Sequence, residues 1–98
     1  MEITKNREGK ELTVLIHGNI DTNTSGEIEK LIVNELKGVE HLVLDLSEVS
    51  YISSSGLRLF MILYKKLADQ GGVTLVNVND FIMDILEMTG FSNILEIK

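Results

Sequence analysis

The 98-residue sequence contains no cysteine, no proline and no tryptophan. Without cysteine there is no disulfide, no thiolate nucleophile and no cysteine-ligated metal. Without proline, no helix is interrupted by a residue that lacks a backbone N–H. The two histidines, His17 and His41, stand far apart and match no spacing that is used for zinc. We therefore expect neither a metal nor a cofactor.

A basic surface and a long apolar run are also missing. The formal net charge is −6 at pH 7, which argues against nucleic acids and anionic membranes as partners, because both are bound through positive charge. No apolar segment approaches the roughly 20 residues that span a bilayer. Residues 1–5 lack the apolar core of a signal peptide. These absences predict a cytoplasmic protein that binds neither nucleic acid nor membrane.

The composition is that of an ordinary globular domain, with 44% hydrophobic and 24% charged residues. A chain of this length folds as one domain, which we expect to span residues 1–98. Strand patterns occur at residues 3–7, 12–17, 41–46 and 73–78. Helix patterns begin near residues 24, 54 and 80 and end before the glycines at 38, 71 and 90. The tail, residues 91–98, is expected to form a last short strand or turn.

This order of elements predicts an α/β fold, with a mixed, mostly parallel sheet of four to five strands packed with three or more helices. The first two strands form a hairpin, and each later strand follows a helix, which implies right-handed crossovers between parallel neighbours. Residues 41–46 barely alternate between apolar and polar, which favours a strand covered on both faces. Thr24 and Glu27 form a capping-box pattern. In the last helix, Phe81, Ile85 and Met88 recur one or two turns apart.

The second helix pattern has two distinct faces when about 100° is assigned to each residue. The expected core side carries Leu57, Phe60, Leu63, Tyr64 and Leu67. The opposite side carries Arg58, Lys65 and Asp69, with Ile62 among them, and Ser54 falls near Met61 and Lys65 on the rim. An apolar residue amid exposed charge beside a serine is typical of a surface that docks another protein.

Three serines and a glycine, residues 53–56, lead into this helix. Serines in that position serve as N-caps, because the first amide groups of a helix lack backbone partners. The same amides and the helix dipole also tolerate a phosphate, which makes a phosphorylation switch a second interpretation. From the spacing alone, both interpretations remain open.

Two motifs resemble those of a known family. Residues 45–57 read Asp-Leu-Ser-Glu-Val-Ser-Tyr-Ile-Ser-Ser-Ser-Gly-Leu, and residues 18–21 read Gly-Asn-Ile-Asp, with Thr24 opening the helix that follows. Both resemble the signatures of the STAS-domain anti-sigma factor antagonists, small bacterial regulators of sporulation and stress responses. The resemblance covers essentially the whole chain, including the order of its elements. It implies a regulator without enzymatic activity.

The resemblance also implies a mechanism. In that family the unphosphorylated protein binds an anti-sigma factor that is also a serine kinase, and a sigma factor is released. Phosphorylation by this kinase ends the binding, and a PP2C-type phosphatase restores it. The acceptor would be Ser54. Many relatives have aspartate where this chain has Ser53, which leaves Ser53 as a competing acceptor. The expected partner-binding residues are Asp21, Asn23, Thr24, Ser53, Ser55, Gly56, Arg58 and Ile62.

Three alternatives to this function are considered. A serine hydrolase would use Ser54 with one histidine and either Asp21 or Asp45, but a nucleophile elbow needs glycine where Ile52 stands. A nucleotide site would need a glycine-rich or Walker pattern, and neither is present. A STAS subunit of a stressosome or a transport complex would have the same sequence features as an anti-sigma factor antagonist.

Overall fold

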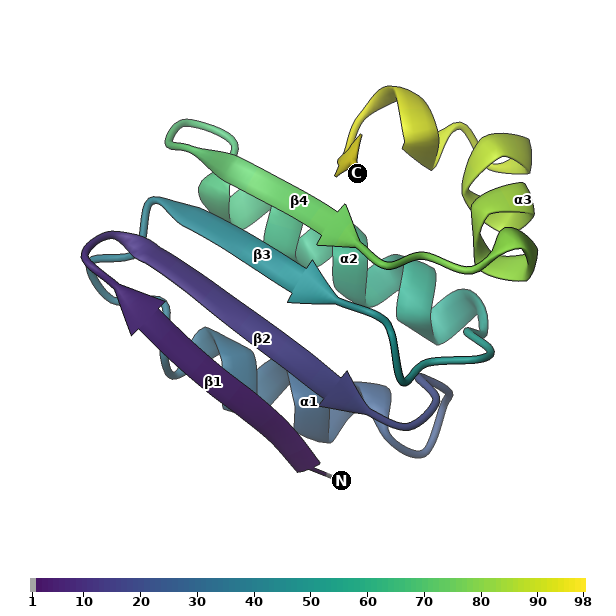
Figure 1. Ribbon diagram of the computed structural model, residues 1–98, viewed down its shortest axis with the longest axis horizontal. Coiled ribbons are helices and arrows are strands. Elements are labelled where there is room, and N and C mark those ends of the chain that lie inside the picture. The colour runs from purple at the N-terminus through teal and green to yellow at the C-terminus, as the bar shows by residue number, and fades with distance from the viewer. Residues whose placement is uncertain (1) are drawn as a thin grey trace.

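The computed structural model describes residues 2–98. They contain one five-stranded sheet, whose strands lie in the order β1-β2-β3-β4-β5. Helices α1 and α2 lie on the same face of this sheet, and α3 lies beyond the C-terminal end of β4 (Figure 1). Met1 lies outside the described residues. The elements are β1 (Glu2–Glu8), β2 (Glu11–His17), α1 (Ser25–Val33), β3 (His41–Asp45), α2 (Ser54–Leu67), β4 (Gly72–Val76), α3 (Asp80–Met88), the 3₁₀ turn η1 (Phe91–Asn93) and β5 (Glu96–Ile97).

The predicted α/β architecture is confirmed. Strands β1 and β2 pair antiparallel as a hairpin, and its turn contains Gly9, whose φ of 61° suits glycine. The remaining neighbours are parallel, with Leu12 opposite Leu42 and Leu42 opposite Val73. The C-terminal tail supplies the short parallel strand β5, where the sequence predicted a last strand or turn.

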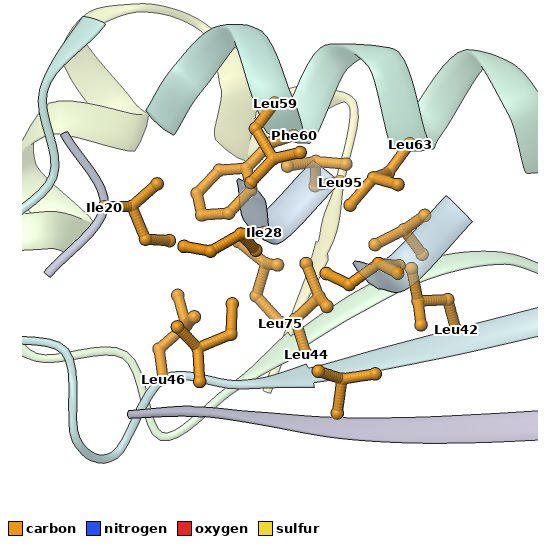
Figure 2. Close-up of a cluster of buried hydrophobic side chains, with 14 of the residues drawn as sticks. Ile20, Ile28, Leu42, Leu44, Leu46, Leu59, Phe60, Leu63, Leu75 and Leu95 are labelled. Atoms are coloured by element: carbon orange, nitrogen blue, oxygen red, sulfur yellow. The ribbon is translucent and has the colours of Figure 1, made fainter. Parts of the chain in front are cut away.

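The core lies between the sheet and the two helices. Figure 2 shows Leu42, Leu44 and Leu46 on the sheet side, facing Leu59, Phe60 and Leu63 of α2. All six side chains are at most 1% exposed. Burial of such side chains contributes about 1.5–3 kcal/mol each, so this layer supplies the main driving force for the fold.

The prediction that residues 41–46 are covered on both faces is wrong. Leu42, Leu44 and Leu46 are buried, whereas His41, Val43 and Asp45 are half-buried on the other face. The reason is topological: the strands are added in one direction across the sheet, and right-handed crossovers in one direction place their helices on the same side. The second face of the sheet therefore carries no helix within residues 2–98.

A chain of side-chain hydrogen bonds crosses this helix-free face. His41 Nδ1 lies 2.8 Å from Glu11 Oε2, and His41 Nε2 lies 2.8 Å from Thr74 Oγ1. The Thr74 hydroxyl donates to Glu96 Oε1 at 2.6 Å. This hydrogen bond, together with the charge of Lys98, lowers the pKa of the Glu96 carboxyl from its ordinary value. The contacts connect β2, β3, β4 and β5, and so help to hold the two-residue strand β5 in place.

The helix faces differ in part from the prediction. In α2 the buried residues are Gly56, Leu59, Phe60, Leu63 and Leu67. Leu57 and Tyr64, which the sequence assigned to the core side, are only half-buried, and Leu59 was missed. The helix also ends at Leu67 rather than at residue 70.

In α3 the N-cap is Asn79, whose Oδ1 accepts a hydrogen bond from the Ile82 amide at 2.8 Å. The buried residues are Ile82 and Leu86. Phe81 and Met88 of the predicted apolar series are instead 52% and 84% exposed. The Phe81 ring stacks on the exposed Tyr51 ring at a centroid distance of 6.0 Å. Within residues 2–98, no helix has both the length and the apolar character that crossing a membrane requires.

Candidate functional site

The serine triplet lies where the chain turns from the loop after β3 into α2. Ser53 is the N-cap of α2, with extended backbone angles, and its Oγ accepts the amide of Ser55 at 3.1 Å. Its carbonyl oxygen accepts the amides of Gly56 and Leu57 at 2.9 and 3.2 Å. The capping interpretation is therefore correct for Ser53, whose hydroxyl is already engaged.

Ser54 differs from both of its neighbours. It is the first residue of α2 and is exposed to solvent. Within residues 2–98 its side chain makes no hydrogen bond. Ser55 is half-buried, and its hydroxyl lies 3.4 Å from that of Thr22. Among the three hydroxyls, that of Ser54 is thus the accessible one, at the helix end where the dipole favours negative charge.

The loop after β2 lies directly against this turn. Ile20 forms an isolated parallel bridge with Ile52. Its amide donates to the Tyr51 carbonyl at 3.3 Å, and its carbonyl accepts the Ser53 amide at 2.9 Å. The fold therefore brings together the two motifs that the sequence analysis singled out, although some 30 residues separate them.

Asn19 is the residue of this contact that the sequence analysis missed. Its Oδ1 accepts three hydrogen bonds, from the Ser50 amide at 2.9 Å, the Ser50 hydroxyl at 3.0 Å and the Tyr51 amide at 3.0 Å. Nothing local in the sequence signals this role, because the donors lie 31 and 32 positions away. Asn19 fixes the segment that delivers the serines.

Asp21 and Thr24 form hydrogen bonds within the loop after β2. Asp21 Oδ1 accepts the amides of Asn23 at 2.8 Å and Thr24 at 3.1 Å. The Thr24 hydroxyl donates to the Asn19 carbonyl at 2.9 Å and makes no capping hydrogen bond to α1. The predicted capping box is therefore wrong, because Thr24 is the N-cap by position but its side chain points back into the loop. Asn23 is exposed, and Asp21 and Thr24 are half-buried.

Gly56 packs against the same contact. It is buried in the first turn of α2. A Cβ at this position would lie 3.1 Å from Ile52 Cβ and 3.3 Å from both Ile20 Cγ2 and the Ile20 carbonyl oxygen. Any side chain here would push α2 away from the loop, so glycine is what allows the helix to begin so close to it.

A small groove of about 150 Å³ runs between α1 and α2, with Ser55 in its wall. Its lining residues are Ser25, Gly26, Glu29, Ser55, Arg58, Leu59 and Ile62. Arg58 is exposed, as predicted, but Ile62 is half-buried in the groove rather than set among exposed charges. Helix α1 covers one side of Ile62, which the sequence pattern of α2 alone could not show. A larger groove, of about 570 Å³, is lined by Lys10, Leu36 and Lys66 among others and includes none of the serines.

The side chains required by a hydrolase do not converge on Ser54. His17 contacts Thr4 at 2.6 Å and Glu48 at 3.0 Å, while His41 belongs to the hydrogen-bond chain on the helix-free face. Asp45 Oδ1 accepts the Ser47 amide at 2.9 Å and the Asn77 side chain at 3.0 Å. Partial burial raises the pKa of the Asp45 carboxyl, but these hydrogen bonds outweigh it and leave the pKa below its ordinary value. In the described part of the chain, no three His, Asp or Glu side chains are grouped as metal ligands.

The chain is similar to known proteins along nearly its whole length. A family model described as "STAS domain" matches residues 2–98. The "Anti-sigma-B factor antagonist" of Listeria monocytogenes is 35% identical over 96 residues, which cover 96% of this chain and 84% of that protein.

Solved structures show the same fold. An anti-sigma factor antagonist from Mycobacterium paratuberculosis matches with a TM-score of 0.88 at 24% identity, over 98% of this chain and 83% of that one. The Bacillus cell fate determinant SpoIIAA in its phosphorylated form matches with a TM-score of 0.75 at 15% identity, over 99% of this chain and 91% of that one. At these identities the structures establish a shared fold.

Proposed function

Because the chain belongs to the STAS domain family, we propose that it is an anti-sigma factor antagonist that is switched off by phosphorylation at Ser54. The unphosphorylated form binds an anti-sigma factor serine kinase in the cytoplasm and thereby frees a sigma factor. The observation that carries the proposal is the Ser54 hydroxyl at the start of α2, which is exposed and makes no hydrogen bond with any of residues 2–98. A relative at 35% identity that is named for this activity supports it.

The chain is not an enzyme. The curated relatives that it matches are named as antagonists of a protein factor, which is a regulatory and not a catalytic role. Their names also favour a partner-switching regulator over a subunit of a stressosome or a transport complex. In this proposal the serine is a substrate for another protein rather than a nucleophile.

Phosphorylation acts on the contact surface in this proposal. A phosphoserine adds about −1.5 to −2 charges and a strongly hydrated group. If Ser54 lies in the centre of the interface, that group must lose its water or hold the partner away. A penalty of only about 1.4 kcal/mol lowers the affinity tenfold. Refolding of the domain is unnecessary, because the start of a helix accommodates a phosphate.

The partner surface comprises the exposed part of the two joined segments. Ser54, Ser55 and Arg58 contribute from α2, and Asn23 contributes from the loop after β2. Asp21, Thr24, Ser53 and Gly56 support this surface from behind, through the hydrogen bonds and close packing described above. Ile62 lines the adjoining groove. A PP2C-type phosphatase would reach the same exposed serine and restore binding.

The test is intact-mass analysis of the protein after incubation with ATP and the anti-sigma factor kinase from the same genome, followed by peptide mapping. We expect a single added phosphate, located on Ser54, and none in the Ser54→Ala variant. The Ser53→Ala variant is the matched control and should still be phosphorylated. A phosphate that maps to another residue, or no phosphate at all, would contradict the proposed function.

A further inference from the structure

Charge is distributed unevenly over the three helices. The chain as a whole carries a net charge of −6. Helix α3 contains Asp80, Asp84 and Glu87 without a cation, and α1 contains two glutamates and one lysine. Helix α2 instead contains Arg58, Lys65 and Lys66 and no acidic residue. The helix that begins at the proposed acceptor is thus the basic helix of an acidic protein.

Two of these cations share one line along α2. Arg58 and Lys65 are seven residues apart, which places them on the same side of the helix about 10 Å apart along its axis. Both are exposed, and Met61 and Ile62 between them are half-buried. Ser54 precedes Arg58 by one turn and lies within the same arc of the helix. We call the surface formed by Arg58, Met61, Ile62 and Lys65 the basic face of α2.

The cations of the basic face form no ion pair within the described residues 2–98. Lys5 pairs with Glu35, Lys10 with Glu40, and the two histidines pair with Glu48 and Glu11. Neither Arg58 nor Lys65 forms an ion pair with any residue in the range 2–98. Glu29 of α1 lines the groove beside Arg58, and Asp69 follows the end of α2; both carboxylates lie at the margins of this face.

We propose that the basic face of α2 docks an acidic segment of the anti-sigma factor kinase. This segment presents two carboxylates about 10 Å apart, which match Arg58 and Lys65. An apolar side chain between the carboxylates contacts Ile62 and enters the groove between α1 and α2. This inference rests on the proposed function and specifies the chemistry of the partner surface.

The same charges explain how a phosphate on Ser54 ends the interaction. A phosphoserine one turn before Arg58 forms a charge-assisted pair with its guanidinium at the i, i+4 spacing. Arg58 is then no longer available to the partner, and the charge of the basic face falls from about +2 to about zero. The acidic segment meets a neutral or repellent surface where it previously met an attractive one.

A charge-reversal experiment with the kinase tests this inference. The Arg58→Glu/Lys65→Glu variant should bind the kinase at least tenfold more weakly than the wild type at low salt, and the difference should shrink as salt is added. The Lys30→Glu/Lys37→Glu variant changes the net charge equally, at exposed positions outside α2, and should bind within threefold of the wild type. Thermal unfolding verifies that both variants are folded. Equal affinity of the two double variants overturns the inference.

A second probe separates this inference from the proposed function. The probe is a helical peptide with two glutamates seven residues apart and a leucine between them, titrated into the isotope-labelled protein at low salt. Amide NMR shifts confined to α2, and absent both in the Arg58→Glu/Lys65→Glu variant and with a scrambled peptide, support the inference. Shifts elsewhere or none overturn it. If the kinase fails to bind the wild type, the proposed function fails and the peptide result decides the inference alone.

Discussion

The amide of Ser53 donates to the carbonyl oxygen of Ile20 at 2.9 Å, between residues that lie more than 30 positions apart. The Ile20 amide returns a hydrogen bond to Tyr51, and Asn19 adds three more with its side-chain oxygen. The loop after β2 and the turn before α2 are therefore joined by a network of hydrogen bonds. The position of the Ser54 hydroxyl depends on this network as much as on α2.

Gly56→Ala should destabilise the protein by about 1 kcal/mol. The methyl group would crowd Ile52 and the Ile20 backbone, an overpacking cost of roughly 1–3 kcal/mol, against a gain of up to about 1 kcal/mol in helix propensity. Chemical denaturation measures the change. Gly26→Ala is the matched control, because a Cβ there meets nothing within 4 Å, and it should be neutral or slightly stabilising. A stabilised Gly56→Ala variant would show that the contact is not tight.

Ser53→Ala should lower the free energy of unfolding by about 1 kcal/mol, the usual effect of losing an N-cap. Ser54→Ala should change it by less than about 0.5 kcal/mol, as expected for an exposed residue without contacts. Thermal or urea unfolding of the two variants, side by side, measures both effects. The reverse order would mean that Ser54 and not Ser53 caps the helix.

Ser54→Asp should bind the anti-sigma factor kinase at least tenfold more weakly than Ser54→Ala, because it adds a negative charge where the phosphate would lie. Ser54→Ala should bind constitutively and resist phosphorylation. Isothermal titration calorimetry, or a binding assay with one protein immobilised on a surface, measures both affinities in the presence of ADP. If the two variants bind equally, a charge at this position does not control the interaction.

Arg58→Ala should weaken kinase binding while leaving the free energy of unfolding within about 0.5 kcal/mol of the wild type. The side chain is exposed and makes no ion pair within residues 2–98, so its removal takes away a partner contact but no internal one. Binding assays and thermal unfolding of the same preparation give the two quantities. A large loss of stability would identify Arg58 as a structural residue.

Asp45 should contribute stability that disappears in acid. The pKa of its carboxyl in the folded protein lies below the ordinary value, so the unfolded chain takes up the proton first as the pH falls. The contribution is complete above the unfolded pKa of about 3.9 and is lost as the pH falls through the lower folded value. Asp45→Asn should therefore lose less stability than the wild type between about pH 5 and pH 2. If the free energies of unfolding of the two proteins fell equally as the pH is lowered, this prediction would be wrong.

Local patterns predicted most of the fold. Alternation in β2, the glycines between elements and the alternating order of strands and helices led to the hairpin, the parallel strands and the short last strand. The uncovered face of β3 was missed because Val43 is apolar like its neighbours, and a sequence does not show on which side the crossover helices lie. That side follows from the strand order, which is a property of the whole sheet.

The faces of α3 show a second limit of prediction from the sequence. Apolar residues occupy both of its stripes, with Phe81 and Met88 on one and Ile82 and Leu86 on the other. Periodicity therefore identifies the helix but not its buried side. The structure settles the orientation through Asn79, which caps α3 and also donates to the carbonyls of Val49 and Ser50. Only a contact across some 30 residues of sequence distinguishes the two faces.

The sequence pointed to the residues of the candidate site, but it did not show which of them hold the loops together and which face solvent. The motifs pointed to the serine triplet and to Asp21, and the structure places them side by side. It also separates the residues that hold the loops, such as Ser53 and Thr24, from those that face solvent, such as Ser54 and Asn23. Hydroxyl groups look alike in a sequence, and only their hydrogen-bond partners distinguish a cap from a free group.

The bridge between Ile20 and Ile52 has a consequence for which molecules can present the surface around Ser54. The surface around Ser54 is assembled from two stretches of chain that the fold brings together, so we expect an enzyme that recognises this surface to act on folded rather than unfolded molecules. A linear fragment of residues 45–62 would contain the serine motif but lack residues 18–24, which contact it in the folded protein, and we expect it to be a poor substitute for the folded surface. Under the proposed function, signalling would therefore depend only on those molecules that have finished folding.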